Sequence, residues 1–345
     1  MTADNTPTET PPMSRAEQMR AKVTVIPYVS MADASVHDHS TRDKQFPGLH
    51  NDLLFLWAMA DTADGKRYEL VRTLSASATY DFTVHECSTE LWSDPRNVWF
   101  PGENDLYWGP ILWIEREGEQ TLFPANLDMR AKHPIRVSLG PERYVWKEHR
   151  DGVDIVLTPL PMNVTTIYVP GPPDDVGYTS SGCSVSGSIQ GSPIVGGYGG
   201  LDRMYCLPGM SAQVSKIAEL EHYWFVWGAV FADGHWETGN AMLGAGDYAT
   251  ATFHRQGEDP IIATNREVGS KVVWEAKGDV RQPVHARLEF GGRTFTFDAT
   301  HNAAAAAVSM GIAWMHGNVR EQGAPEPVRC WSTMEVIKIR ATPRD

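Results

Sequence analysis

The chain has 345 residues, and its 30 lysines and arginines against 43 aspartates and glutamates give a formal charge of −13. Binding to nucleic acid depends on basic side chains that release counterions from phosphates, so this charge argues against a nucleic-acid partner. The length is sufficient for two domains, each with its own core. No segment approaches the roughly 20 apolar residues that cross a bilayer, and the N-terminus lacks the apolar centre of a secretory signal. We therefore expect a cytoplasmic protein with no membrane span.

The aromatic residues favour a mostly β protein. The 12 Trp, 11 Tyr and 11 Phe recur beside Val, Ile and Thr in short alternating segments rather than in helical stripes. The 30 Gly and 23 Pro are spread along the chain, as expected for many short turns. The four cysteines, Cys87, Cys183, Cys206 and Cys330, are too scattered for a zinc knuckle or a Cys-x-x-Cys redox pair, which predicts buried free thiols.

The first residues of the chain carry little structural signal. Residues 1–20 are polar and rich in proline at their start, and they are predicted to form a disordered tail. Residues 37–39 read His-Asp-His, but in a strand the aspartate would point away from the two histidines. We expect no metal site there and no cofactor in the chain.

A strand, an Asp-Gly turn and a second strand occur twice. The first set covers residues 50–57, 61–65 and 66–72, and the second covers residues 222–231, 232–234 and 235–243. This pattern predicts a pseudo-repeat of two β domains. The proline-rich residues 171–175 lie between the two sets, so we place an N-terminal domain at residues 21–172 and a C-terminal domain at residues 173–345. The alanine run at residues 303–307 is compatible with a helix or with a strand whose small side chains face a cavity.

Residues 182–205 form the most informative segment. A strand through Ile189 turns at residues 190–193 and returns with glycines at positions 196, 197, 199 and 200. Backbone without side chains suits a sharp bend or the close approach of another group. The segment is not a nucleotide loop, because no Lys-Ser/Thr pair and no helix pattern follow it. It ends in the charged pair Asp202-Arg203.

The hairpin ending Gly-x-Gly-x-x-Asp-x-x-aromatic, with the two strand, Asp-Gly turn, strand units, resembles the AttH and carotenoid 1,2-hydratase (CrtC-like) superfamily. The resemblance implies two lipocalin-like antiparallel β-barrel domains packed together. It also implies cofactor-independent addition or removal of water at isoprenoid double bonds, with acidic, histidine and aromatic residues at the domain interface. Where the superfamily has Asp-His-Asn-Trp, this chain has Asp202-Arg203-Met204-Tyr205. Arginine cannot shuttle protons at neutral pH, so Arg203 would instead bind a substrate oxygen, which favours an oxygenated lipophile.

The residues themselves suggest acid–base chemistry. Adjacent strand residues face opposite sides, so one of Asp202 and Arg203 points into a barrel. A buried Asp202 would have a raised pKa and could donate a proton, whereas the alternative is a structural ion pair with Arg203. His222 and Trp224 share a strand face, and the alternative for His222 is a core histidine. The expected catalytic residues are Asp202, His222 and Tyr205, and the expected substrate-binding residues are Arg203, Trp224, Trp57, Tyr68 and Glu237.

Two functional hypotheses follow. The first is a cofactor-independent lyase or isomerase, of the hydratase or dehydratase type, acting on an oxygenated terpenoid, steroid-like or polyketide-like molecule. The second is a non-catalytic protein that binds or carries a lipophile, with Arg203 holding its polar end. Both have a small lipophilic molecule as partner. The sequence leaves the oligomeric state open, with a homodimer among the alternatives.

Overall fold

The computed structural model describes residues 26–33, 46–75, 79–88, 107–108, 111–116, 119–124, 135–140, 142–148, 152–171, 174–208, 217–277, 280–299 and 312–337. The tail expected at residues 1–20, the His-Asp-His segment at residues 37–39 and the alanine run at residues 303–307 lie outside these ranges. Within them, no helix is long and apolar enough to cross a membrane.

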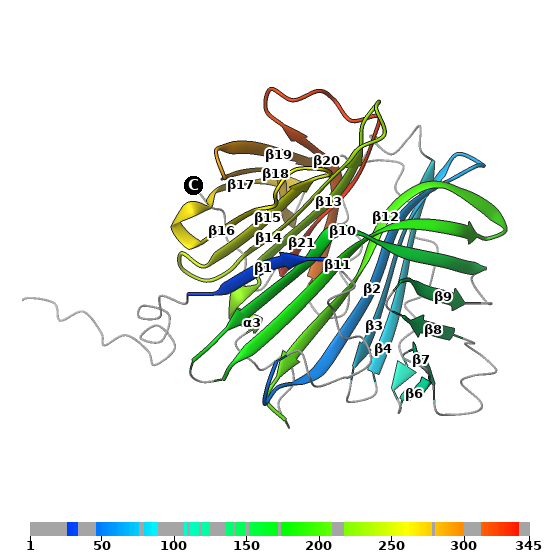
Figure 1. Cartoon of the computed structure of the whole chain (residues 1–345). Coiled ribbons are helices and arrows are strands. Elements are labelled where there is room, and N and C mark those ends of the chain that lie inside the picture. Colours follow the sequence, from blue (N-terminus) through cyan, green and yellow to red (C-terminus); the bar gives the residue numbers. More distant parts are fainter. Residues whose placement is uncertain are drawn as a thin grey trace, which may run out of the picture.

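The N-terminal part of the chain forms a curled antiparallel sheet of 12 strands (Figure 1). Its order is β5-β4-β3-β2-β12-β11-β10-β9-β8-β7-β6, and β1 pairs with β10. The strands are β1 (Tyr28–Ala32), β2 (His50–Thr62), β3 (Lys66–Ser75), β4 (Thr79–Ser88), β5 (Tyr107–Trp108), β6 (Ile111–Arg116), β7 (Glu119–Pro124), β8 (Ile135–Leu139), β9 (Tyr144–Glu148), β10 (Val153–Val169), β11 (Val176–Ile189) and β12 (Ser192–Cys206).

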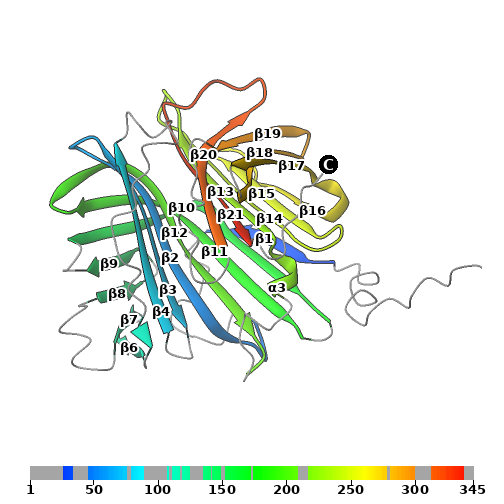
Figure 2. The same cartoon turned by 180° about the vertical axis from the view of Figure 1, so that it is seen from behind.

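The C-terminal part forms a second antiparallel sheet of nine strands, in the order β16-β15-β14-β13-β21-β20-β19-β18-β17 (Figure 2). Its elements are β13 (Tyr223–Val230), β14 (Trp236–Leu243), β15 (Ala249–Arg255), β16 (Ile261–Thr264), β17 (Gly269–Lys277), β18 (Val280–Phe290), β19 (Arg293–Ala299), β20 (Ile312–Glu321) and β21 (Arg329–Ile337), with the short helices α3 (Ile217–Leu220) and η2 (Asn265–Glu267). The two curled antiparallel sheets confirm the predicted mostly β fold.

The segment between Val169 and Val176 is a hairpin connection. It joins β10 to β11, which pair with each other in the N-terminal sheet. Residues 172 and 173, where the sequence places the domain boundary, lie outside the described ranges. The last strand of the N-terminal sheet ends at Cys206, and the first strand of the C-terminal sheet begins at Tyr223. Both units of the strand, Asp-Gly turn, strand pattern are antiparallel hairpins, formed by β2 with β3 and by β13 with β14.

Three main groups of buried apolar residues follow from strand alternation. One fills the concave side of the N-terminal sheet and includes Leu54, Leu56 and Leu201. A second fills the C-terminal sheet and includes Phe225 and Trp227. The third contains residues from both sheets, so it lies between them; its members include Trp57, Met59, Tyr178, Tyr198, Trp224, Val226 and Trp331. We call this third group the intersheet layer.

The hairpin of β11 and β12 owes its register to two features. Gln190 and Gly191 have positive φ angles of 50° and 79°, as a two-residue turn between right-twisted strands requires. A bulge then shifts the pairing, because the three residues of β11 between Ser184 and Ser188 face the four residues of β12 between Pro193 and Tyr198. As a result Asp202 lies opposite Ser180 rather than one residue away from it.

Glycines allow the two sheets to approach closely. A Cβ atom on Gly228 of β13 would lie 2.3 Å from the ring of Tyr198, and one on Gly196 of β12 would lie 2.5 Å from the guanidinium of Arg329 in β21. The close approach expected for the glycine-rich strand is therefore confirmed. Any larger residue at these positions would push the layer apart.

Replacement of Gly187 by alanine should destabilise the fold. The new Cβ would lie 2.2 Å from the backbone oxygen of Asp154, and the φ angle of 112° is unfavourable for any side chain. We expect a loss of about 1–3 kcal/mol, measured by urea unfolding. Gly191→Asn is the matched control, since Gly191 has open space around it and asparagine tolerates its positive φ. Equal stability of Gly187→Ala and the wild type would contradict this close approach of Gly187 to the backbone of Asp154.

Candidate functional site in the intersheet layer

Asp202 lies in the middle of β12, on the face that meets the C-terminal sheet. It pairs with Ser180 of β11 on one side and with Phe55 of β2 on the other. Its side chain is buried, with 5% of the residue exposed. Its neighbours two positions along the strand, Gly200 and Met204, face the same layer. The strand alternation that the sequence predicts therefore directs Asp202 to the C-terminal sheet.

The surroundings of Asp202 raise its pKa to about 7, from an ordinary value of 3.8. Burial is the largest cause, because a carboxylate loses its hydration there. The nearby polar groups of Ser180, Trp57 and Tyr178 oppose this shift and lower the pKa. Within the described part of the chain, Oδ1 of Asp202 has no hydrogen-bond partner. At neutral pH the carboxyl is thus divided between its acid and its base form.

Trp57 connects Asp202 to the opposite sheet. Its indole meets that of Trp224 edge to face, with ring centroids 5.6 Å apart. It also lies 5.4 Å from the ring of Tyr198, which packs on Gly228 of the other sheet. Aromatic faces beside a proton donor can stabilise a positive charge that develops on a substrate.

A row of mostly polar side chains crosses the C-terminal sheet on the face that meets the N-terminal sheet. The register aligns His316 of β20, Thr333 of β21, Val226 of β13 and Asn240 of β14. All of them lie on the face that meets the N-terminal sheet, since Val226 belongs to the intersheet layer. Over the residues that the structure covers, four buried donors here have no hydrogen-bond partner: Trp224 Nε1, Asn240 Nδ2, Trp331 Nε1 and Thr333 Oγ1. Such donors would bind the oxygen atoms of a ligand.

A second pair of titratable side chains, Glu69 of β3 and His316 of β20, spans the layer between the two sheets. Nε2 of His316 forms an ion pair with Oε2 of Glu69, and both side chains are buried. Burial raises the pKa of Glu69 well above its ordinary value, and the negative charge of Glu335 raises it further. Glu335 pairs with Trp224 in the sheet register. Asp202 is thus connected through Trp57 and Trp224 to Glu335. The charge of Glu335 in turn influences Glu69, which pairs with His316.

One edge of the layer opens into a small pocket. It has a volume of about 80 Å³ and is lined by Leu160, Pro161, Trp236, Thr238, His254 and Gln256. Thr238 donates a hydrogen bond of 3.0 Å to Asn163, and the side chain of Asn163 acts to lower the pKa of the Tyr198 hydroxyl. Burial lowers the pKa of His254 at the pocket wall. The pocket is therefore linked by polar groups to the interior of the layer.

Arg203 faces away from this layer. It pairs with Leu54 and lies on the same face of β12 as Leu201, both of which belong to the core of the N-terminal sheet. The Arg203 side chain is fully buried, and its positive charge acts to lower the pKa of the Tyr144 hydroxyl. No hydrogen-bond partner for any of its three guanidinium nitrogens exists among the residues described. Asp202 and Arg203 do not form the ion pair that we considered from the sequence, because they lie on opposite faces.

The other expected site residues are dispersed. Tyr205 packs against Phe46, with ring centroids 4.9 Å apart, and Tyr68 donates a hydrogen bond of 3.2 Å to Gln190 from within the N-terminal core. His222 precedes β13, and its backbone bonds to Leu243 and Ile337. Of the eight expected residues, the structure brings together Asp202, Trp57 and Trp224.

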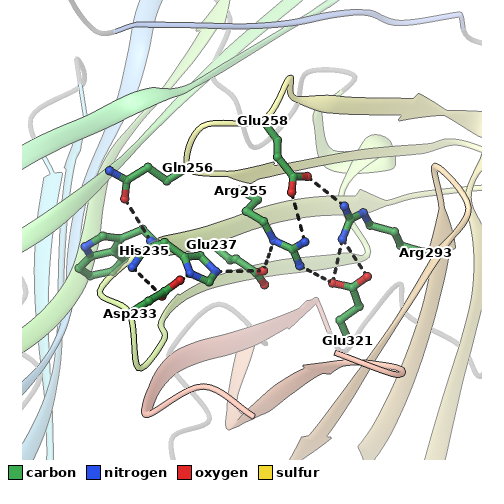
Figure 3. A network of polar contacts seen from close by, with 9 residues as sticks. Asp233, His235, Glu237, Arg255, Gln256, Glu258, Arg293 and Glu321 are labelled. Carbon is green, nitrogen blue, oxygen red and sulfur yellow. Dashed lines mark hydrogen bonds and ion pairs between the residues drawn. The ribbon is translucent and has the colours of Figure 1, made fainter. Parts of the chain in front are cut away.

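Glu237 belongs to a network of ion pairs in the C-terminal sheet (Figure 3). It accepts a hydrogen bond of 2.5 Å from Arg255, which also contacts Glu258 and Glu321. Arg293 closes the network by pairing with Glu321 at 2.8 Å and with Glu258 at 3.1 Å. Ala229, the pairing partner of Glu237, belongs to the core of the C-terminal sheet, so Glu237 faces away from the intersheet layer.

Sequence reasoning missed Tyr178, Ser180, Glu69 and His316. The bulge in β12 between Pro193 and Tyr198 displaces the register by one residue, so simple counting from the turn would place Leu201 opposite Ser180. Glu69 and His316 are far apart in the chain, and only the packing of the two sheets brings them together. A buried strand position for Glu69, between the apolar Tyr68 and Leu70, was the one available signal.

Comparison with known proteins gave matches among solved structures only, since no family model and no curated protein matches the chain. A protein assigned to AttH from Nitrosomonas europaea is 14% identical, with 86% of this chain and 98% of that chain covered and a TM-score of 0.49. CghA with Sch210972 is 11% identical, with 91% and 99% covered and a TM-score of 0.47. Kievitone hydratase from Nectria haematococca is 11% identical, with 88% and 93% covered and a TM-score of 0.43.

The raised pKa of Asp202 predicts how stability varies with pH. Because the folded state holds this proton more tightly than the unfolded state, its contribution is fully present below 3.8 and is lost as the pH rises to about 7. Asp202→Asn removes the titration, so the variant should gain stability over the wild type across this window, by at most about 4 kcal/mol. Urea unfolding at several pH values measures the difference. Asp154→Asn, at an exposed site, is the control, and a pH-independent difference for Asp202→Asn would contradict the raised pKa.

Proposed function

We propose that the protein is a lyase or isomerase of the hydratase or dehydratase type, which uses the intersheet layer for acid–base catalysis on an oxygenated lipophilic molecule. The observation that carries the proposal is the buried Asp202 carboxyl, whose pKa of about 7 suits proton transfer at neutral pH. The aromatic side chains of Trp57, Trp224 and Tyr198 around it make the layer apolar enough for a lipophile.

Each side chain has a specific role in this proposal. Protonated Asp202 donates its proton to the substrate, and the indole faces of Trp57 and Trp224 stabilise the resulting positive charge. The His316–Glu69 pair accepts a proton, either from water that adds to the cation or from a carbon next to it. Loss of that carbon proton gives an isomerised product when Asp202 has protonated a double bond, and a dehydrated product when Asp202 has protonated a hydroxyl group that leaves as water. The donors Asn240 and Thr333 bind the substrate oxygen.

The first experiment identifies the substrate. Native mass spectrometry of protein from its own host, followed by extraction of any bound lipophile, supplies the candidate. The candidate is then incubated with the wild type, with Asp202→Asn and with Asp154→Asn as the matched surface control. Only the wild type and the control should produce an isomer, or a product that differs by one water molecule.

Turnover should depend on Asp202 in a defined way. Asp202→Asn should lower the rate by about 10²–10⁴-fold, the usual range for loss of a general acid. The wild-type rate should fall as the pH rises through about 7, because the donor must be protonated. Turnover rates of the extracted lipophile, measured in pH-jump assays to several pH values, would test this. An Asp202→Asn variant with the wild-type rate and pH profile would refute the assignment.

A second function, lipophile binding, is favoured by Arg203 in the N-terminal core. A buried guanidinium is normally paired, as shown by Arg72, which lies in the same core and donates a 2.8 Å hydrogen bond to Glu148. Arg203 has no such partner in the described ranges, and its neighbours Leu54 and Leu201 are apolar. An acid with an apolar tail matches this combination of one cation and a hydrophobic core. Protein atoms cover the guanidinium, so entry of the acid requires side chains to move.

Arg203→Met should raise the thermal midpoint of the ligand-free protein, because it removes a buried charge without partners. It should also abolish binding of decanoate, measured by calorimetry, whereas Asp202→Asn should leave that binding intact. Methyl decanoate, which lacks the charge, should bind the wild type much more weakly than decanoate. Arg136→Met, at an exposed position of β8, is the control. Equal affinity of Arg203→Met and the wild type for decanoate would exclude this second function.

A further inference from the structure

A different set of chemically active side chains lies where β2 begins and β12 ends. His50, the first residue of β2, pairs directly with Cys206, the last residue of β12. Asp52 follows two positions after His50. One ligand atom from each of His50, Asp52 and Cys206 lies within 4.8 Å of those of the other two. The cluster is separated from Asp202 by four residues of extended β12, or about 13 Å of strand.

The three groups fit the coordination chemistry of zinc. Thiolate sulfur binds zinc at about 2.3 Å and imidazole nitrogen at about 2.0 Å, so neighbouring ligand atoms in a tetrahedral site are roughly 3.5 Å apart. A set that already lies within 4.8 Å reaches this geometry through small side-chain movements. Thiolate together with imidazole favours zinc over magnesium or calcium, which bind oxygen ligands.

The burial of the cluster supports a bound ion. Asp52 is 7% exposed and Cys206 is fully buried. Nδ1 of His50 is also buried, and the described residues offer it no hydrogen-bond partner. Buried polar atoms are normally satisfied, so an unsatisfied imidazole nitrogen beside a thiol and a carboxyl indicates a missing ligand.

Asp174 provides a fourth group. It lies in the connection between β10 and β11 and is 3% exposed. Its negative charge, like that of Asp52, raises the pKa of the Cys206 thiol. A tetrahedral zinc site needs four ligands, and a site filled entirely by side chains is structural rather than catalytic. An ion here would tie the β10–β11 connection to the ends of β2 and β12.

We infer that His50, Asp52 and Cys206 bind one zinc ion, with Asp174 as the fourth ligand. Binding forms a sulfur–zinc bond while the thiol proton of Cys206 passes to solvent, and no electron transfer is involved. The inference is independent of the function proposed for Asp202, since it concerns metal content and stability rather than turnover.

The test uses the full chain, stripped with a chelator, incubated with zinc chloride and desalted. Elemental analysis should give close to one zinc per chain for the wild type and for Cys183→Ala, which removes another buried thiol as the matched control. Cys206→Ala should fall to the blank. Asp174→Asn, a milder change, should retain zinc with an affinity lower by on the order of 10–100-fold.

Cobalt substitution gives a readout that a structural role of Cys206 would not produce. Cobalt chloride added to the stripped wild type should produce a thiolate-to-cobalt charge-transfer band, present in Cys183→Ala and absent from Cys206→Ala. Zinc should raise the thermal midpoint of the wild type and leave that of Cys206→Ala unchanged. The inference is overturned by a wild type that retains no zinc above the blank, or by a Cys206→Ala variant that folds and retains as much zinc as the wild type.

Discussion

The burial of both faces of β2 and β12 is the constraint on which the rest of the structure depends. One face of each strand fills the N-terminal sheet through Leu56 and Leu201, so the other face has to be covered by the second sheet. Coverage at close range is possible because Gly228 accepts the ring of Tyr198. The two sheets therefore share one continuous layer, and the residues at its centre are removed from water although they belong to neither barrel interior.

This layer contains charges of two kinds. Arg67 and Asp61 form a buried bidentate pair, and Arg67 also donates a 3.2 Å hydrogen bond to the carbonyl of Cys330 in the opposite sheet. Such paired charges fix how the sheets meet, since breaking one would leave its partner uncompensated. The Asp202 carboxyl is different, because burial outweighs its hydrogen bonds and brings its pKa to about 7. The Arg67–Asp61 pair thus serves structure, whereas the Asp202 carboxyl has the pKa that the proposed proton transfer requires.

Strand β12 directs three reactive side chains to three separate environments, because its side chains alternate between two faces and the strand is long. Asp202 lies in the intersheet layer, and Arg203 lies in the core of the N-terminal sheet. Cys206 is the last residue of the strand and lies beside His50. Side chains that are adjacent in sequence are directed to different environments by a period of two. An assignment of Asp202 and Arg203 to one ligand, natural from their adjacency, is therefore incompatible with an extended strand.

Sequence by itself determined the class of fold and part of the site. Alternating aromatic and β-branched segments predicted the antiparallel sheets, and the glycine-rich strand marked the region of close approach around Asp202, because both signals are local. The division between the sheets, the contact of Trp57 with Trp224 and the pairing of Glu69 with His316 were decided by tertiary structure. The physical reason is that the register around Asp202 depends on a bulge in β12 between Pro193 and Tyr198, and that burial of Asp202 depends on a second sheet encoded elsewhere in the chain. A local pattern can show which residues face together, but only packing shows what they face.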